Sequence, residues 1–381
     1  MSFWKKALFA NSKVFLILIG VSIIFALTPA GRPVGKVLVL LPEVVPSVPV
    51  KPLRFLSKEP VVEEVKIKTS NEEVMADIYR PNDNRRHPAI IFSLGTIISR
   101  KDETVVRITE ALARSGFVVL TPDIPDLISG FVWPDSVRIL VSSVEYLDNQ
   151  PYVKRDKIGF AGFCVGSSAS ILAAQNPKIA DKVAFVSAIS PYFNLITLSE
   201  AVVTKQADNG QGKFEPWNPD QLSVKSVQKG FINYIADRKE REILYRHFLE
   251  NRKINQEQIN GFSNEAKSIY EFLANSDGSQ RAEIWASFPQ EGKDLLTELS
   301  PSADISSLKA KLFVLNDKND TYVPKIEGVR LAESLPKDQI YFVEVDSFEH
   351  VNPATSLPRW AAIKQLFNVG RYLYNVFSEV S

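Results

Sequence analysis

The single cysteine of this 381-residue chain, Cys164, lies between two glycines in the stretch "GFCVG", Gly162 to Gly166. The residues before it read as a strand and the small residues after it as a helix, so Cys164 is expected at a strand-to-helix turn. That is the setting of a nucleophile elbow, where a tight turn excludes side chains two positions to either side. The helix N-terminus would stabilise a thiolate. Alternatively, Cys164 only fills space in a core, because cysteine is often buried.

A cysteine nucleophile needs a base and an acid, and an elbow predicts the chain order nucleophile, acid, histidine. His350, in "DSFEHVNP" after a strand-like run, is the expected base. His87 precedes a strand and so lies at the wrong end of the sheet, while His247 lies in a charged helical segment. Asp320, in "DKNDTYVP", is the expected acid, and Asp317 is its competitor closer to the strand end. The alternative for His350 is a solvated loop histidine.

The oxyanion of a tetrahedral intermediate needs two N–H donors beside the nucleophile. The first is expected from Val165, the residue after the nucleophile. The second is expected from the loop after the strand "AIIFSLG", where Gly95, Thr96 and Ile97 are candidates. We predict Thr96, because Gly95 allows the loop to bend before it.

The elements around these residues predict an α/β fold, with a mostly parallel sheet covered by helices on both faces. The chain from Val61 begins with an antiparallel hairpin broken at Ser70 and Asn71, and strands then alternate with helices. Strands are expected at 87–95, 116–125, 156–163, 181–190, 308–317 and 338–346, and helices at 101–115, 134–148, 164–177, 324–336 and 355–380.

A polar, helical insert of residues 191–302 interrupts this alternation. Inserts of this length are usually functional, so we predict a lid over the site, with a solvated decoration as the alternative. Its aromatic residues Trp217 and Trp285, with Phe214 and Phe288 nearby, are expected to line an acyl pocket. The alternative is that these four residues only pack the insert itself.

The N-terminal 30 residues are predicted to form a signal anchor or signal peptide. Lys5, Lys6 and Lys13 precede the apolar run "VFLILIGVSIIFAL" at 14–27, which favours an uncleaved membrane anchor. The positive-inside rule then places the rest of the chain on the exported, periplasmic or extracytoplasmic side, or outside the cell if the segment is cleaved. Residues 31–60 are read as a linker, because prolines preclude one continuous helix over 34–52. The catalytic domain is expected to cover 61–381.

The composition narrows the class of partner. The net charge of +1 and the pI of 7.7 give no reason to expect nucleic acid as a partner. One cysteine excludes an intrachain disulfide and any multi-cysteine metal site. Neither a metal nor an organic cofactor is implied, and the oligomeric state is not indicated.

The elbow and the order of its partners resemble the α/β-hydrolase superfamily and, within it, the dienelactone hydrolase family, whose elbow carries cysteine. The resemblance implies Cys164 as nucleophile, Asp320 as orienting acid and His350 as base. It implies hydrolysis of a carboxylic ester, lactone or thioester through a thioacyl-enzyme. Members that cleave dienelactones carry an acidic residue just past the third strand, where this chain has Leu94-Gly95-Thr96. An acyltransferase with the same triad and a non-catalytic binding protein are the alternatives.

Overall fold

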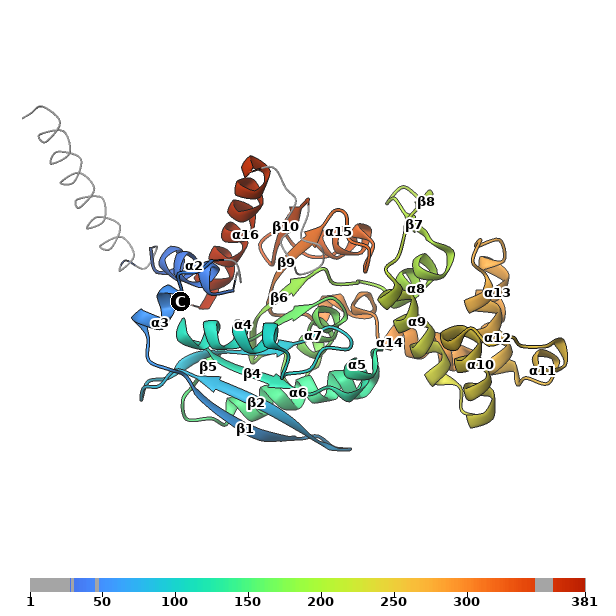
Figure 1. Cartoon of the computed structure of the whole chain (residues 1–381), viewed down its shortest axis with the longest axis horizontal. Coiled ribbons are helices and arrows are strands. Elements are labelled where there is room, and N and C mark those ends of the chain that lie inside the picture. Colours follow the sequence, from blue (N-terminus) through green and yellow to red (C-terminus); the bar gives the residue numbers. More distant parts are fainter. Residues whose placement is uncertain (1–27, 29–30, 45–47, 347–358, 381) are drawn as a thin grey trace, which may run out of the picture.

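The structure is a computed structural model and describes residue 28 and residues 31–44, 48–346 and 359–380. In this part of the chain, an eight-stranded sheet forms the centre of the molecule. Its strands are β1 Val61–Lys68, β2 Glu73–Arg80, β3 His87–Ser93, β4 Val118–Pro122, β5 Val153–Phe163, β6 Val183–Ile189, β9 Lys311–Asp317 and β10 Ile340–Val345. Their spatial order is β1-β2-β4-β3-β5-β6-β9-β10 (Figure 1).

The direction of the strands confirms the predicted sheet. β1 and β2 form an antiparallel hairpin, and β2 also runs antiparallel to β4. From β4 to β10 all neighbouring strands are parallel. The carboxyl ends of β3, β5, β6 and β9 therefore meet at one edge, which is where open α/β sheets bind ligands.

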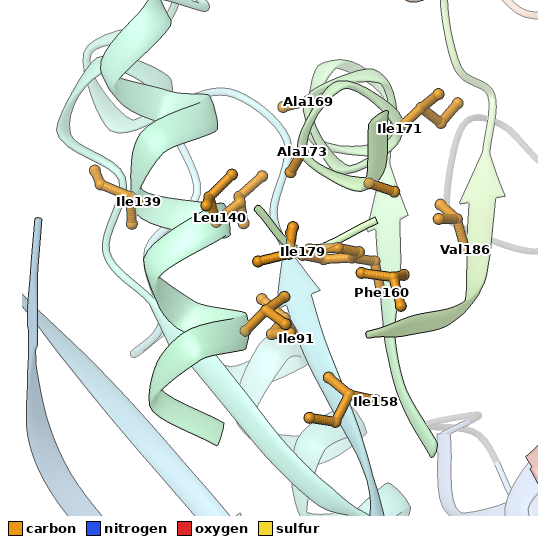
Figure 2. Close-up of a cluster of buried hydrophobic side chains, with 14 of the residues drawn as sticks. Ile91, Ile139, Leu140, Ile158, Phe160, Ala169, Ile171, Ala173, Ile179 and Val186 are labelled. Carbon is orange, nitrogen blue, oxygen red and sulfur yellow. The ribbon is translucent and has the colours of Figure 1, made fainter. Parts of the chain in front are cut away.

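Helices cover both faces of the sheet, and each face has its own apolar core. One face carries α5 Pro125–Ser129, α6 Pro134–Asp148, α7 Val165–Gln175 and α15 Lys325–Glu333. The other carries α2 Gly31–Val44, α3 Pro52–Leu56, α4 Glu103–Arg114 and α16 Arg359–Val380. Figure 2 shows the first core, where Leu140 of α6 and Ala173 of α7 lie near Ile91 and Phe160 of the sheet. A strand covered on both sides reads as a continuous apolar run, and β3 is accordingly buried throughout.

The segment 31–60, read as a linker, includes two packed helices, which is a difference from the prediction. α2 places Val37 and Leu40 in the second core, and α3 places Leu53 there. Pro42 lies only two residues before the end of α2, so its missing N–H costs the helix one hydrogen bond in its last turn. The helix still ends before residue 52, so the prolines do prevent one continuous helix over 34–52.

The insert between β6 and β9 is largely helical and has a core of its own. Its elements are α8 Leu195–Thr204, β7 Gln206–Asp208, β8 Phe214–Pro216, α9 Gln221–Tyr234, α10 Arg238–Glu250, α11 Gln256–Asn260, α12 Asn264–Ala274, α13 Arg281–Ser287 and α14 Gln290–Glu298. The short hairpin β7–β8 was not predicted. Figure 1 shows these helices grouped at one end of the molecule, beyond α7.

The predicted anchor at 14–27 lies outside the described residues. Among the residues that are described, none of the helices combines the length and the apolar character that a membrane span requires.

Candidate active site

Cys164 occupies the turn between β5 and α7, and its backbone has a conformation that residues other than glycine rarely adopt. Its φ is 52° and its ψ is −129°, and such backbone strain persists only where the surroundings hold it. The Cys164 N–H donates to the carbonyl of Ile189 at 2.8 Å, and its own carbonyl accepts from the N–H of Ser167 at 3.0 Å. The turn is therefore tied to both β6 and α7.

The two flanking positions must be glycine for the reason that the elbow predicts, because neither has room for a side chain. A Cβ on Gly162 would lie 2.9 Å from the backbone N and Cα of Ser167. A Cβ on Gly166 would lie 2.2 Å from the carbonyl oxygen of Leu94, in the loop after β3. Both contacts are with backbone atoms, so no side-chain movement can relieve them.

The loop after β3 passes beside the nucleophile. A Cβ on Gly95 would lie 3.8 Å from the Cβ of Cys164, and Thr96 is buried. The Ile97 N–H donates to the carbonyl of Leu127 at 2.8 Å, so it is engaged elsewhere. Val165 is the first residue of α7, where backbone N–H groups have no partner within the helix. This geometry favours Val165 and Thr96 as the oxyanion donors.

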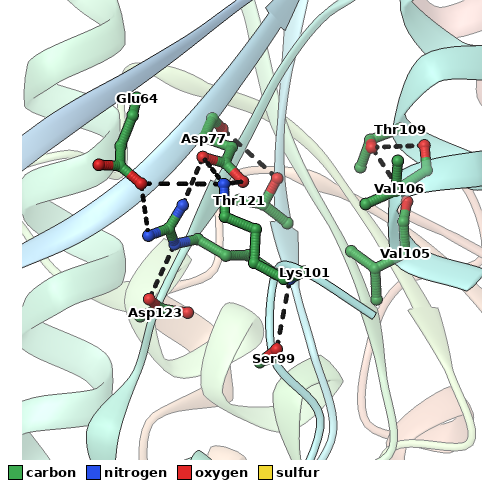
Figure 3. A network of polar contacts seen from close by, with 10 residues as sticks. Glu64, Asp77, Ser99, Lys101, Val105, Val106, Thr109, Thr121 and Asp123 are labelled. Carbon is green, nitrogen blue, oxygen red and sulfur yellow. Dashed lines mark hydrogen bonds and ion pairs between the residues drawn. The ribbon is translucent and has the colours of Figure 1, made fainter. Parts of the chain in front are cut away.

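A buried ion cluster holds the far end of this loop (Figure 3). The Arg100 guanidinium is 7% exposed and binds three carboxylates, those of Glu64 and Asp123 at 2.8 Å each and that of Asp77. Lys101 adds a second cation, 2.8 Å from Asp77. Because these carboxylates belong to β1, β2 and the residue after β4, the cluster fixes the loop against three parts of the sheet.

Asp320 lies in the loop after β9 and is buried. Its Oδ1 accepts from the N–H groups of Tyr322 at 2.6 Å and Val323 at 3.1 Å, and both of these residues line the same cavity as Cys164. Burial raises the pKa of Tyr322, and the nearby carboxylates of Asp220 and Asp320 add to that effect.

Asp317, the competitor, is the last residue of β9 and pairs with Val345 in the sheet. Its carboxylate accepts from the N–H of Asn319 at 2.9 Å. Neither aspartate is itself among the described residues that line the cavity, but Asp320 accepts hydrogen bonds from Tyr322 and Val323, which are. These contacts favour Asp320 over Asp317 as the acid.

The insert braces the Asp320 loop through three hydrogen bonds. Trp217 Nε1 donates to the Asp320 carbonyl at 2.9 Å, and the Asp220 N–H donates to the Thr321 carbonyl at 2.7 Å. Ser223 Oγ donates to the Tyr322 carbonyl at 3.0 Å. No sequence pattern indicated these three hydrogen bonds, because they depend on the direction in which the loop carbonyl groups point.

His350, the predicted base, lies outside the described residues. Two other histidines are accounted for. His87 begins β3, at the opposite end of the strand from Thr96, and its Nε2 lies 2.7 Å from Asp83 Oδ1. His247 is on α10, and its Nδ1 lies 2.8 Å from the carbonyl of Arg252.

Cys164 opens into a cavity between the sheet edge and the insert. The volume of this cavity is about 120 Å³. Thr96, Val165 and Tyr322 line it on the sheet side. The insert supplies apolar side chains from α8, α9 and α14, among them Leu198, Phe231 and Leu296, and Phe288 from the link between α13 and α14.

Trp217 and Trp285, expected to line an acyl pocket, are not among the described lining residues. Trp217 turns its indole N–H to the Asp320 carbonyl. Trp285 donates to the carboxylate of Glu200 and packs on Phe288, with ring centroids 5.1 Å apart. Phe288 lines the cavity itself. Tryptophan carries a polar N–H, and in both cases this N–H donates to a residue that is not among the described lining residues.

A buried carboxylate connects the insert to α15. Glu327 accepts from the N–H groups of Phe193 at 2.9 Å and Asn194 at 2.8 Å, and from the Thr197 hydroxyl. Burial raises the pKa of Glu327, although these hydrogen bonds and Arg330 oppose the shift. Glu327 therefore anchors the start of α8, the first helix of the insert. No cluster of three or more His, Cys, Asp or Glu side chains suited to a metal ion is found among the described residues.

Comparison with known proteins matches the dienelactone hydrolase family over residues 74–209. This range contains Thr96, Cys164 and Val165 but neither Asp320 nor His350. A protein of a Bradyrhizobium species, named "Probable 2-oxo-3-(5-oxofuran-2-ylidene)propanoate lactonase", is 31% identical over 140 residues, which cover 32% of this chain and 54% of the relative. The chain thus spans about half the length of the curated relative that it matches.

A solved structure of a peptidase supports the fold. A puromycin-hydrolysing peptidase of Mycobacterium tuberculosis aligns with a TM-score of 0.51 and 13% identity, over 86% of this chain and 40% of the peptidase. An esterase of the archaeon Pyrobaculum calidifontis aligns with a TM-score of 0.46 and 16% identity, over 96% of this chain and 98% of the esterase. At this identity the likeness of the peptidase concerns the fold alone.

Proposed function

Because this chain is an α/β-hydrolase related to the dienelactone hydrolase family, we propose that it hydrolyses a carboxylic ester, lactone or thioester with Cys164 as nucleophile. The observation that carries the proposal is the conformation of Cys164, which holds its side chain in a strained elbow beside Thr96 and Val165 on the wall of one cavity. A cysteine that only filled space would not need a positive φ between two glycines that cannot carry a side chain.

The reaction proceeds in two steps. His350 accepts the thiol proton, and the Cys164 sulfur attacks the substrate carbonyl carbon. The tetrahedral oxyanion collapses, the bond to the leaving alkoxide or thiolate breaks, and His350 returns the proton to that group. Water then loses a proton to His350 and attacks the thioacyl carbon, which releases the acid and the thiol. Asp320 holds the imidazole in the tautomer that this sequence needs.

The surroundings of Cys164 supply the stabilisation of the oxyanion. We expect the N–H of Val165 at the start of α7 and the N–H of Thr96 to donate to the developing charge, and the Arg100 cluster supports the loop of Thr96. Residues of the insert line the cavity and hydrogen-bond to the Asp320 loop, which supports a role of the insert in the site. The lactonase name of the Bradyrhizobium relative supports a lactone among the substrate classes.

The decisive experiment compares purified wild type with Cys164→Ala on panels of p-nitrophenyl esters, lactones and thioesters. We expect wild-type turnover and a loss of at least about a thousandfold in Cys164→Ala. Iodoacetamide labels the only thiol of the chain, so loss of activity should follow the labelled fraction. His350→Ala and Asp320→Ala should also lose turnover, whereas Asp317→Asn should retain more of it than Asp320→Asn. Full hydrolysis by Cys164→Ala would refute the nucleophile.

We also propose that residues 14–27 anchor the protein in a membrane, with the catalytic domain on the exported side. The support is the sequence alone, in which basic residues precede an apolar run. Protease protection in spheroplasts tests this, since an exported domain is digested without lysis. A full-length protein found only in the cytosol would refute it.

A further inference from the structure

Among the described residues on the wall of the cavity beside Cys164, none is Asp, Glu, Lys, Arg or His. Most of the polar side chains on this wall carry hydroxyl groups, of which Ser223 donates to the Tyr322 carbonyl and Ser226 to the Thr96 hydroxyl. A charged acyl group buried here would lack a counter-ion among these residues, and the cost of burying an unpaired charge is large.

The apolar wall extends from the nucleophile into the insert. Leu198 and Val202 of α8, Phe231 of α9, and Leu296 of α14 contribute to it, and all four are buried. The wall therefore continues through three helices of the insert. Such a shape suits a long or bulky acyl group better than an acetyl group.

One polar group in this wall has no partner among the described residues. Ser199 on α8 is 1% exposed, and its Oγ makes no hydrogen bond to any of them. Two other buried helical serines donate to the carbonyl four residues before, Ser143 to Ile139 and Ser268 to Asn264, each at 2.8 Å. Ser199 does not use this option. A buried hydroxyl without a partner is costly, so it is usually matched by a ligand or water.

We propose that the cavity binds an uncharged, largely apolar acyl group, and that one hydroxyl or oxo oxygen on this group hydrogen-bonds to Ser199. This inference rests on the proposed function, because it assigns the acyl side of the same substrate. It predicts selectivity against acyl groups that carry a carboxylate, although the curated relative is named for a substrate that carries one.

The first experiment measures kcat/KM for p-nitrophenyl esters that share one leaving group. From acetyl to octanoyl, each methylene that reaches the wall should raise kcat/KM by about threefold. The half-ester of suberic acid has the octanoyl length but ends in a carboxylate, and it should react at least about a hundredfold more slowly than the octanoyl ester. Equal rates for these two esters would overturn the uncharged pocket.

The second experiment isolates Ser199. Octanoyl esters with an oxo group moved along the chain should show one favoured position in the wild type. Ser199→Ala should lower that preference about threefold to tenfold, because the hydroxyl that binds the oxo group is removed. Ser268→Ala is the matched control, since Ser268 is buried in the insert but does not line the cavity. An unchanged preference in Ser199→Ala would overturn the contact.

A binding measurement separates this inference from the proposed function. Calorimetry of Cys164→Ala with the N-methyl amides of butanoic, octanoic and suberic acids reports the pocket without chemistry. Chain-length-dependent binding of the uncharged amides without any esterase activity would refute the proposed function and retain the pocket. Cys164-dependent hydrolysis with no preference for long, uncharged acyl groups would support the proposed function and refute the apolar pocket.

Discussion

The substitution Gly166→Ala tests the elbow most directly, because it adds one methyl group between the nucleophile turn and the oxyanion loop. The new Cβ would lie 2.2 Å from the Leu94 carbonyl oxygen and 2.7 Å from the Ser93 carbonyl oxygen. Both atoms belong to the backbone at the end of β3, which is buried. Helix α7 and the loop that carries Thr96 must therefore separate by roughly 1 Å to restore an ordinary carbon–oxygen contact.

The size of the effect follows from this separation. Overpacking of a buried site typically costs about 1–3 kcal/mol, and the upper end applies because no side chain can rotate away. We expect the free energy of unfolding to fall by about 3 kcal/mol. A displacement of about 1 Å in a catalytic geometry costs about a hundredfold in rate. The fraction of protein that remains folded should thus lose about a hundredfold in kcat/KM.

The assay combines urea unfolding, followed by tryptophan fluorescence, with kcat/KM on the octanoyl ester. The concentration of folded sites is taken from iodoacetamide titration of Cys164. Gly261→Ala is the control, because its Cβ would lie 3.5 Å from the nearest atom at a φ of −84°, so its stability should change by about 0.5 kcal/mol or less. Gly166→Ala with unfolding energy and activity close to those of Gly261→Ala would refute the close approach of α7 and the loop.

Three further substitutions test the remaining contacts. Trp217→Phe removes the donor to the Asp320 carbonyl. It should lower kcat/KM about threefold to tenfold and leave the chain-length preference unchanged. A changed chain-length preference would mean that Trp217 shapes the pocket. Burial raises the pKa of Glu327, so the folded protein holds this proton more tightly than the unfolded chain. The free energy of unfolding should therefore fall as pH rises from the ordinary glutamate pKa through the raised one, a decline measured by urea unfolding that Glu327→Gln should lack. Burial, with the positive charges of Lys154 and Arg32, lowers the pKa of Lys36 to about 8, so the free energy of unfolding should rise with pH between about 8 and 10. Lys36→Met should abolish that rise and increase the free energy of unfolding at pH 7 by about 1–3 kcal/mol. A rise that is retained in Lys36→Met would refute the assignment to Lys36.

The elbow could be predicted because its requirements are local. A strand, a turn with glycines on both sides and a small-residue helix occupy one short stretch around Cys164, and the clashes at Gly162 and Gly166 bear out the reason for both glycines. The alternation of strands and helices is likewise local, since a strand covered on both faces reads as an apolar run. The role of His350 stays a prediction, because it lies outside the described residues.

The missed features depend on the direction of side chains rather than on residue type. Trp217 and Trp285 are aromatic residues of the insert, but their indole N–H groups bind Asp320 and Glu200 and so decide where the rings lie. Ser199 sits in the ordinary sequence "LITLSEAVVT", and only the fold shows that its hydroxyl has no partner. The packing of α2 was not predicted, because the prolines of 34–52 exclude one continuous helix but do not exclude a shorter helix that contains Pro42 near its end.

The contacts of the insert decide between a decoration and a part of the site. The same segment supplies the apolar wall of the cavity and the three hydrogen bonds to the Asp320 loop. Glu327 in turn fixes the first helix of the insert to α15, which follows that loop in the chain. A solvated decoration could move without changing the Asp320 loop or the cavity wall. Movement of this insert would displace both of them. In the proposed mechanism, the insert therefore links the binding of the acyl group to the position of Asp320, the residue proposed to orient the base.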